Sequence, residues 1–191
     1  GRASEFEEPF EWLEKVGLVL RCFNLNAIEK PLEANVDKNY FKAFITDIGL
    51  LMAMYPLSTS QEFLLNELDS RKGAIFENLL ATTINKAGLP LYYFSNGTEH
   101  LEIDFILEDN EGIVLLEEKS VNGKMSASKN VMEGKTKYKA KICYKIIQEN
   151  FGQGNFYTSI PQYAISFLLD KIKFDLEKGI NFEPLIYPTN L

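Results

Sequence analysis

The chain has 191 residues, of which 46% are hydrophobic and 25% are charged, and its formal net charge is −7. A chain of this length and composition can bury a core, which excludes a disordered tail and favours one medium domain or a domain plus an appendage. No apolar run approaches the roughly 20 residues of a membrane-spanning helix, so we expect a cytoplasmic protein with no membrane partner.

The N-terminal third of the chain alternates short helical and strand-like patterns. Residues 9–24 predict a short amphipathic helix that Gly17 ends before a strand begins. Residues 39–55 predict a strand that turns into an apolar helix near Asp47. A Ser or Thr cap then predicts another helix over 58–68.

The strongest helical pattern in the chain covers residues 71–88. Gly88 is its expected stop, and its apolar side chains recur at i, i+3 and i+4 spacing: Phe76, Leu79, Leu80, Thr83, Ile84 and Ala87. Glu77 lies about 100° round the helix from Phe76 and therefore falls at the border of this apolar stripe.

Mainly strand-like patterns follow that helix. Residues 89–96 are rich in β-formers, and two apolar runs, LEIDFIL and GIVLLEEK, are joined by a hairpin-length turn at 108–112. The rest of the chain predicts a helix, two strands and a closing helix, at 126–139, 140–147, 155–160 and 161–179.

Charged side chains interrupt the two apolar runs of this hairpin. Because side chains alternate along a strand, Glu117 and Lys119 point to one face while Glu118 points to the other. Asp104 comes thirteen positions before Glu117, and a tight antiparallel hairpin can bring two such positions level, about 5 Å apart. Two carboxylates that close require a cation, and Mg²⁺ accepts oxygen ligands, so Asp104 and Glu117 are the candidate metal ligands.

A lysine beside such a metal pair points to phosphate chemistry. The metal can generate hydroxide from water, and Lys119 can stabilise the negative charge that develops on a phosphate. The set therefore suits phosphodiester hydrolysis. The alternative is purely structural: Asp104 as a capping residue and Glu117–Lys119 as an exposed strand end.

A basic segment follows directly. From Lys119 to Lys145 the chain has eight lysines and one acid, Glu133, so this segment carries +7 and the remainder −14. Such a stretch predicts a phosphate-facing surface. The alternative is a solvated lysine-rich helix and edge strand. The candidate nucleic-acid contacts are Lys124, Lys129, Lys135, Lys137 and Lys139.

The order of these motifs resembles the PD-(D/E)xK nuclease superfamily, which has the restriction-endonuclease-like fold. Its core runs helix, three antiparallel strands, helix and strand, with Asp in the second strand and Glu-x-Lys in the third. The resemblance matches Asp104 to the Asp, Glu117 and Lys119 to the Glu-x-Lys, and Glu77 to an acid often found on the first helix. It implies a catalytic role for these four residues and Mg²⁺ or Mn²⁺ as the cofactor.

At family level, KGAIFENLL, LEIDFIL, LLEEKS and IPQYAISFLL look like the uncharacterised C-terminal domain of bacterial and archaeal AAA-type ATPases. The upstream WLEKVGLV and FKAFITDIGLLMAM are similar to that family's connector, which follows a winged-helix segment. The resemblance spans about residues 9–185. Glu118 stands where the family usually has an apolar residue, which leaves open whether Glu117 or Glu118 faces the site. Ile103 replaces the proline of the superfamily name.

These observations predict an α/β protein with a restriction-endonuclease-like core, a mixed sheet with flanking helices. The core is expected over 71–191, behind a small helical, winged-helix-derived connector over 9–70, and residues 1–8 read as a cloning remnant or a ragged end. The predicted function is that of a nuclease-like domain of an AAA-type ATPase, which hydrolyses phosphodiesters or handles DNA. The alternatives are an inactive protein-interaction or regulatory module and a DNA-binding domain that does not cleave.

The implied partners are DNA and the protein's own N-terminal ATPase domain, and the sequence is compatible with a homo-oligomer. ATP would bind only through that ATPase module. The Gly134-Lys135-Thr136 step is no phosphate loop, because Lys129 stands where the motif needs its first glycine.

Overall fold

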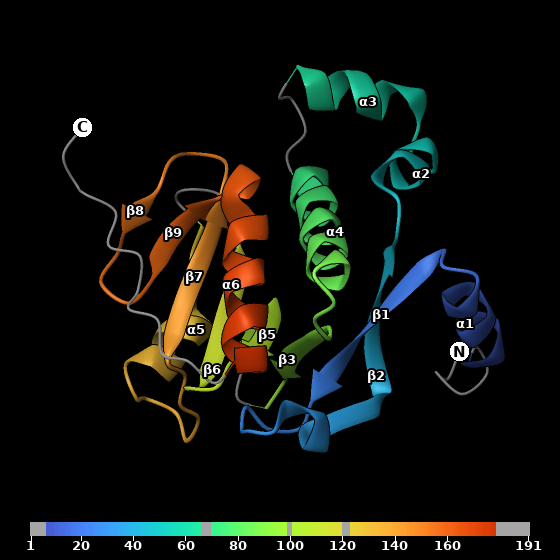
Figure 1. Ribbon diagram of the computed structural model, residues 1–191. Helices are drawn as coiled ribbons and strands as arrows, with labels where there is room; N and C mark the ends of the chain where they lie inside the picture. The colour runs from blue at the N-terminus through green and yellow to red at the C-terminus, as the bar shows by residue number, and fades with distance from the viewer. Residues whose placement is uncertain (1–6, 66–69, 99–100, 120–122, 179–191) are drawn as a thin grey trace.

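The computed structural model describes residues 7–65, 70–98, 101–119 and 123–178 (Figure 1). Residues 1–6 of the predicted remnant at 1–8 lie outside these ranges. So do residues 66–68 of the predicted helix at 58–68. The first six elements are α1 (Glu7–Lys15), β1 (Val19–Leu25), the 3₁₀ helix η2 (Leu32–Asn35), β2 (Val36–Ile45), α2 (Ile48–Ala53) and α3 (Leu57–Leu64).

The predicted helix stop at Gly17 is confirmed, but the predicted Ser or Thr cap of the helix over 58–68 is wrong. Helix α3 begins at Leu57, and its N-cap residue, Pro56, makes no side-chain hydrogen bond. Gly17 has φ +75°, a left-handed conformation that glycine adopts without strain, and its N–H donates to the Glu14 carbonyl just after α1. Asp47 is the N-cap of α2, where its side chain accepts a hydrogen bond from the backbone N–H of Leu50.

The second part of the chain begins with the long helix α4. Its elements are α4 (Ser70–Lys86), β3 (Tyr92–Asn96), β4 (Leu101–Ile103), β5 (Phe105–Glu108), β6 (Ile113–Glu118), α5 (Ser126–Met132), β7 (Ile142–Ile147), β8 (Gly152–Gln153), β9 (Thr158–Pro161), η3 (Gln162–Ala164) and α6 (Ile165–Lys178). Pro161 closes β9, so the predicted closing helix begins with a 3₁₀ turn before α6.

The strands form two mixed sheets, ordered β2-β1-β3-β4 and β5-β6-β7-β9-β8. In the first sheet β1 pairs with β3 in parallel, and in the second β6, β7 and β9 run parallel to one another. Helices α4 and α6 lie side by side on one face of the second sheet, and α5 lies behind it (Figure 1). The predicted α/β class, with a mixed sheet and flanking helices, is confirmed.

Asp104 alone separates β4 from β5, and the chain bends there. Ile103 packs into one hydrophobic cluster and Phe105 into the other, although only one residue stands between them. Strict alternation would place both on one face. The bend therefore shifts the alternation of side chains between the two faces by one residue. It also marks the junction of the two sheets.

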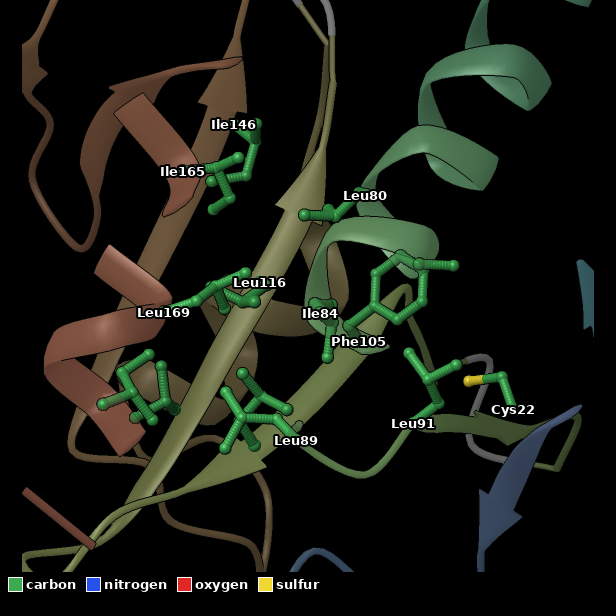
Figure 2. Close-up of a cluster of buried hydrophobic side chains, with 14 of the residues drawn as sticks. Cys22, Leu80, Ile84, Leu89, Leu91, Phe105, Leu116, Ile146, Ile165 and Leu169 are labelled. Atoms are coloured by element: carbon green, nitrogen blue, oxygen red, sulfur yellow. The ribbon is translucent and has the colours of Figure 1, made fainter. Parts of the chain in front are cut away.

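The larger hydrophobic cluster lies between the sheets and the α4–α6 layer. Figure 2 shows Leu80 and Ile84 of α4 beside Leu116 of β6, with Leu169 of α6 completing the layer. Cys22 of β1 also belongs to it, as does Phe44 of β2. The described residues before α4 thus share both a sheet and a core with the described residues that follow.

Helix α4 buries a different arc from the one that its apolar spacing predicts. Ile84 is fully buried, but Leu79 remains 39% exposed. The polar Asn78 is buried instead, since its carboxamide accepts from the Ile45 N–H and donates to the Ile45 carbonyl, both at 2.8 Å. The helix packs against β2 as well as α6, so part of the predicted stripe is left facing outward.

Within the described ranges, the structure contains no helix that is long and apolar enough to cross a bilayer.

Candidate functional site

The register of the β5–β6 hairpin places the first two site residues together. Phe105 pairs with Leu116, so Asp104 and Glu117 are one step further along on opposite strands. The turn that sets this register spans residues 109–112, and it is held by the Asp109 side chain, which accepts from the N–H groups of Glu111 and Gly112 at 2.9 Å each. The spacing of thirteen positions therefore brings the two carboxylates level, as the sequence predicts.

Lys119 bridges both carboxylates. Its Nζ lies 2.6 Å from Asp104 Oδ2 and 3.3 Å from Glu117 Oε2, while Asp104 and Glu117 are 7% and 1% exposed. Burial disfavours the charged ammonium, but the two carboxylates outweigh it and raise the pKa of Lys119. Three of the four predicted catalytic residues thus form one cluster.

Glu117 is the most deeply buried member of the cluster. Ser128 of α5 donates its hydroxyl to Glu117 Oε1, so α5 supports the carboxylate from behind the sheet. Burial raises the pKa of Glu117 to about 7, and the Asp104 charge adds to that rise, while Lys119 and the Ser128 hydrogen bond oppose it. The carboxylate is held in a place where a negative charge is unfavourable without a cation.

Glu118 points to the opposite face of the sheet. Its backbone N–H donates to Asp104 Oδ2 at 3.1 Å, but its side chain accepts from Gln162 Nε2 of η3 at 3.2 Å. Burial, followed by the Asp104 charge, raises the pKa of Glu118 to about 7. Glu117 is therefore the glutamate that shares a face with Lys119, and Gln162 is a neighbour that the sequence did not suggest.

Glu77 lies beside the cluster and has its own ion-pair partner. Its Oε1 lies 2.8 Å from Lys42 Nζ, and Lys42 is also 3.6 Å from Glu102. Burial of Lys42 favours its neutral form, but the nearby acids, Glu77 first and then Asp104 and Glu102, together outweigh burial and raise the pKa of Lys42. The charge of Glu77 still reaches the site, because it contributes to the raised pKa of Glu118.

Lys145 of β7 is a site neighbour that the sequence reasoning counted only as part of the basic segment. It pairs in register with Glu117, is 3% exposed, and donates from Nζ to the Gly123 carbonyl at 3.2 Å. Its ammonium also lies 5.5 Å from the centre of the Tyr157 ring. Burial lowers the pKa of Lys145, as does the charge of Lys119. The signal was a lone lysine inside the apolar run ICYKII.

The predicted nucleic-acid contacts lie before, on and after α5, the helix that carries Ser128. Lys129 and Lys135 both approach Glu133, at 3.8 and 2.5 Å, so one acid partly neutralises two of the five lysines. Lys137 lies 5.1 Å from the centre of the Tyr138 ring. Lys124 and Lys139 are exposed. The ion pairs of Lys129 and Lys135 are thus with Glu133 and not with the carboxylates of the Asp104 cluster.

The cluster offers two carboxylates to a cation. Among the described residues, no group of three or more His, Cys, Asp or Glu side chains is arranged to hold a metal ion. Asp104 and Glu117 nevertheless converge on one cationic atom, Lys119 Nζ, and oxygen donors completed by water are what Mg²⁺ uses. The donor set therefore fits a hydrated divalent ion if the lysine moves aside.

Comparison with known proteins bears on the same segment. Residues 72–163 match the family described as a domain of unknown function (DUF4143), and the match includes Glu77, Asp104, Glu117 and Lys119. No curated protein and no solved structure matches the chain. The predicted similarity to an uncharacterised domain family is confirmed over this segment, which carries the whole candidate site.

Proposed function

We propose that this domain hydrolyses nucleic-acid phosphodiesters with a divalent metal ion, as the nuclease-like part of an AAA-type ATPase. The observation that supports this proposal most strongly is the convergence of Asp104 and Glu117 on Lys119 Nζ, at 2.6 and 3.3 Å. Two buried acids and a lysine at one strand end are expensive to keep in a core. A site that binds a cation and a phosphate would account for all three groups, because the carboxylates would bind the cation and the lysine would bind the phosphate.

The charge and position of each residue suggest its role in this reaction. Asp104 and Glu117 would hold Mg²⁺ or Mn²⁺, which supplies a polarised water as the nucleophile. Lys119 offsets the negative charge on the phosphate. Ser128 holds Glu117 in place through its hydrogen bond. Lys145, buried on the neighbouring strand, adds a second positive charge near the end of β6.

The order of elements supports a restriction-endonuclease-like core. The chain runs α4, β3, the bent β4–β5 strand, β6, α5 and β7. This is the order helix, three antiparallel strands, helix and strand. Asp104 lies in the second of those strands, and Glu117 and Lys119 lie at the end of the third.

The test measures metal binding and cleavage in the same proteins. Titration calorimetry with Mn²⁺ should give heat for the parent and none for Asp104→Ala or Glu117→Ala, while Lys119→Ala should still bind. Metal-dependent nicking of plasmid DNA should vanish in both carboxylate variants and fall by on the order of 10²–10³ in Lys119→Ala. The full-length protein with ATP belongs in the assay. Glu102→Ala is the control, since Glu102 is an exposed acid of β4.

A non-catalytic interaction module is the second candidate. The observation that favours it is the exposed apolar surface of the α2–α3 region, where Met54, Leu57 and Leu65 are 68%, 92% and 67% exposed. If the full-length parent binds neither Mg²⁺ nor Mn²⁺ and cleaves neither DNA nor RNA, the nuclease proposal is wrong and this candidate replaces it.

A further inference from the structure

A pocket of about 200 Å³ opens between α4 and the turn from η3 into α6. Its walls are largely apolar and include Phe76 and Leu79 of α4, Tyr163 of η3 and Ile146 of β7. Leu80, Ile146 and Ile165, which also line it, lie at one end of the hydrophobic cluster in Figure 2. The pocket is thus the place where the outward part of the α4 stripe remains uncovered.

Polar side chains also line the pocket, among them Glu118 and Gln162. Glu118 Oε1 accepts from Gln162 Nε2 at 3.2 Å, and both residues line the pocket. With that hydrogen bond formed, the second oxygen of Glu118 and the carbonyl oxygen of Gln162 remain as acceptors, and one N–H of Gln162 remains as a donor. The pocket therefore combines largely apolar walls with an edge on which hydrogen-bond acceptors outnumber donors.

The pocket adjoins the proposed phosphate site through a single residue. The backbone N–H of Glu118 donates to Asp104 Oδ2 at 3.1 Å, while its side chain reaches into the pocket on the other face. A ligand that spans the end of β6 can therefore place one part at Asp104 and Lys119 and another in the pocket. A nucleotide has these two parts, a phosphodiester and an aromatic base.

We propose that the pocket receives one unpaired nucleobase of a single-stranded nucleic acid whose phosphodiester lies at Asp104 and Lys119. This inference rests on the proposed function, because the phosphate position comes from the proposed phosphodiester site. The aromatic side chains carry the stacking contribution: Tyr163 is 72% exposed and thus available to a ligand, and Phe76 faces the same pocket. A base inside a duplex could not enter.

The polar edge selects among the bases. Two acceptors favour a base that presents an amino group, as cytosine does, and a carboxylate accepting from cytosine N4 is an established readout. Uracil presents a carbonyl oxygen at the same position, which can accept only from the remaining Gln162 N–H and leaves the two acceptors without a donor there. An apolar side chain of a partner protein is a poorer occupant, because it would cover the Glu118 carboxylate without offering it a hydrogen bond.

The test compares two single strands whose bases differ in the group that would face Glu118 and Gln162, an amino group in cytosine and a carbonyl oxygen in uracil. Fluorescence anisotropy with Mg²⁺ would follow labelled twelve-nucleotide strands of deoxycytidine and of deoxyuridine. The parent should bind the deoxycytidine strand about tenfold more tightly, within the range of one base contact. Ser166→Phe, which fills the pocket from an exposed position of α6, and Glu118→Leu should bring the two affinities within about twofold of each other.

The control is Ser58→Phe, which adds the same side chain at an exposed position of α3 and should keep the preference. Melting temperatures of all variants would show that they fold. Equal affinities in the parent, no binding of either strand, or a preference that survives both pocket variants would overturn the inference. If cleavage depends on Asp104 but proceeds at the parent rate in both pocket variants, the inference is overturned and the proposed function is not. A pocket-dependent preference without metal-dependent cleavage would support the inference and overturn the proposed hydrolysis.

Discussion

The Lys119 ammonium lies 2.6 Å from Asp104 Oδ2 and so ties the end of β6 to the bend between β4 and β5. Asp104 is 7% exposed, and the Lys119 side chain is 30% exposed. Loss of the lysine would leave Asp104 and Glu117 without the ammonium that contacts both of them. The pair therefore supports the junction of the two sheets as well as the candidate site.

We expect Lys119→Ala to lower the free energy of unfolding by about 1–3 kcal/mol at pH 8, less than for a fully buried pair because the lysine is partly solvated. The loss should be smaller at pH 5, where a proton on Glu117 relieves the repulsion. Urea unfolding at both pH values measures it. Lys129→Ala, which breaks an exposed pair with Glu133 at 3.8 Å, should cost under about 0.5 kcal/mol. Equal losses at the two positions would contradict this prediction.

Glu117 should make the metal-free protein less stable as the pH rises. Its pKa is raised from 4.5 to about 7 in the folded state, so between those values the folded protein holds a proton that the unfolded chain has released. Stability must then fall with rising pH across that window and level off above it. Relative to Glu117→Gln, the parent should lose up to about 3 kcal/mol between pH 4.5 and pH 7.

The control for that measurement is a glutamate with the opposite shift. The hydrogen bond from Lys135 lowers the pKa of Glu133. Its contribution is present above its ordinary pKa and is lost as the pH falls below it. The parent should therefore gain stability relative to Glu133→Gln as the pH rises through the acid range. Parallel curves for the two variants would show that Glu117 is not protonated in the folded state.

Asp109 should be the residue that fixes the hairpin register. It is 4% exposed, accepts from two backbone N–H groups of its turn, and pairs with Lys141 at 3.0 Å. Asp109→Ala should cost about 1–3 kcal/mol, because two partly buried backbone donors and Lys141 lose the carboxylate that they contact. Asp37→Ala removes a similar turn bond, to the Asn39 N–H at 3.0 Å, on a less buried strand. That control should cost less than about 1 kcal/mol in thermal unfolding.

If the lysines after α5 face phosphates, their effect on DNA affinity should depend on salt. Simultaneous replacement of Lys135, Lys137 and Lys139 by Glu should abolish binding, because each lysine–phosphate contact releases counterions. Glu133→Gln should tighten binding and steepen the salt dependence, since Glu133 pairs with Lys129 and Lys135. Anisotropy with labelled DNA from 50 to 200 mM salt measures both effects.

A charge-matched control separates this surface from net charge. Lys15, Lys38 and Lys86 are exposed and lie outside the basic segment. Their replacement by Glu changes the net charge by the same amount, yet it should leave most of the affinity in place. Unchanged DNA binding in the first triple variant would leave its lysines as solubilising surface.

Local patterns were enough to predict the hairpin and its charged cluster. Alternation along IVLLEEK placed Glu117 and Lys119 on one face. The short turn fixed the register that brings Asp104 opposite Glu117. The partners that come from distant segments were not predictable in this way. Lys42 is 35 positions from Glu77, and Gln162 is 44 positions from Glu118. These contacts depend on how the layers pack, which no short pattern encodes.

The parallel pairing of β1 with β3 has a practical consequence for anyone who expresses this protein in pieces. A chain trimmed at residue 70, the expected connector boundary, would lose β1 and leave one edge of β3 without its partner. It would also lose Cys22 and Phe44 from the larger cluster, and so expose apolar surface on α4. An unpaired edge beside an apolar face invites aggregation. Truncations intended to isolate the site should keep the N-terminal strands.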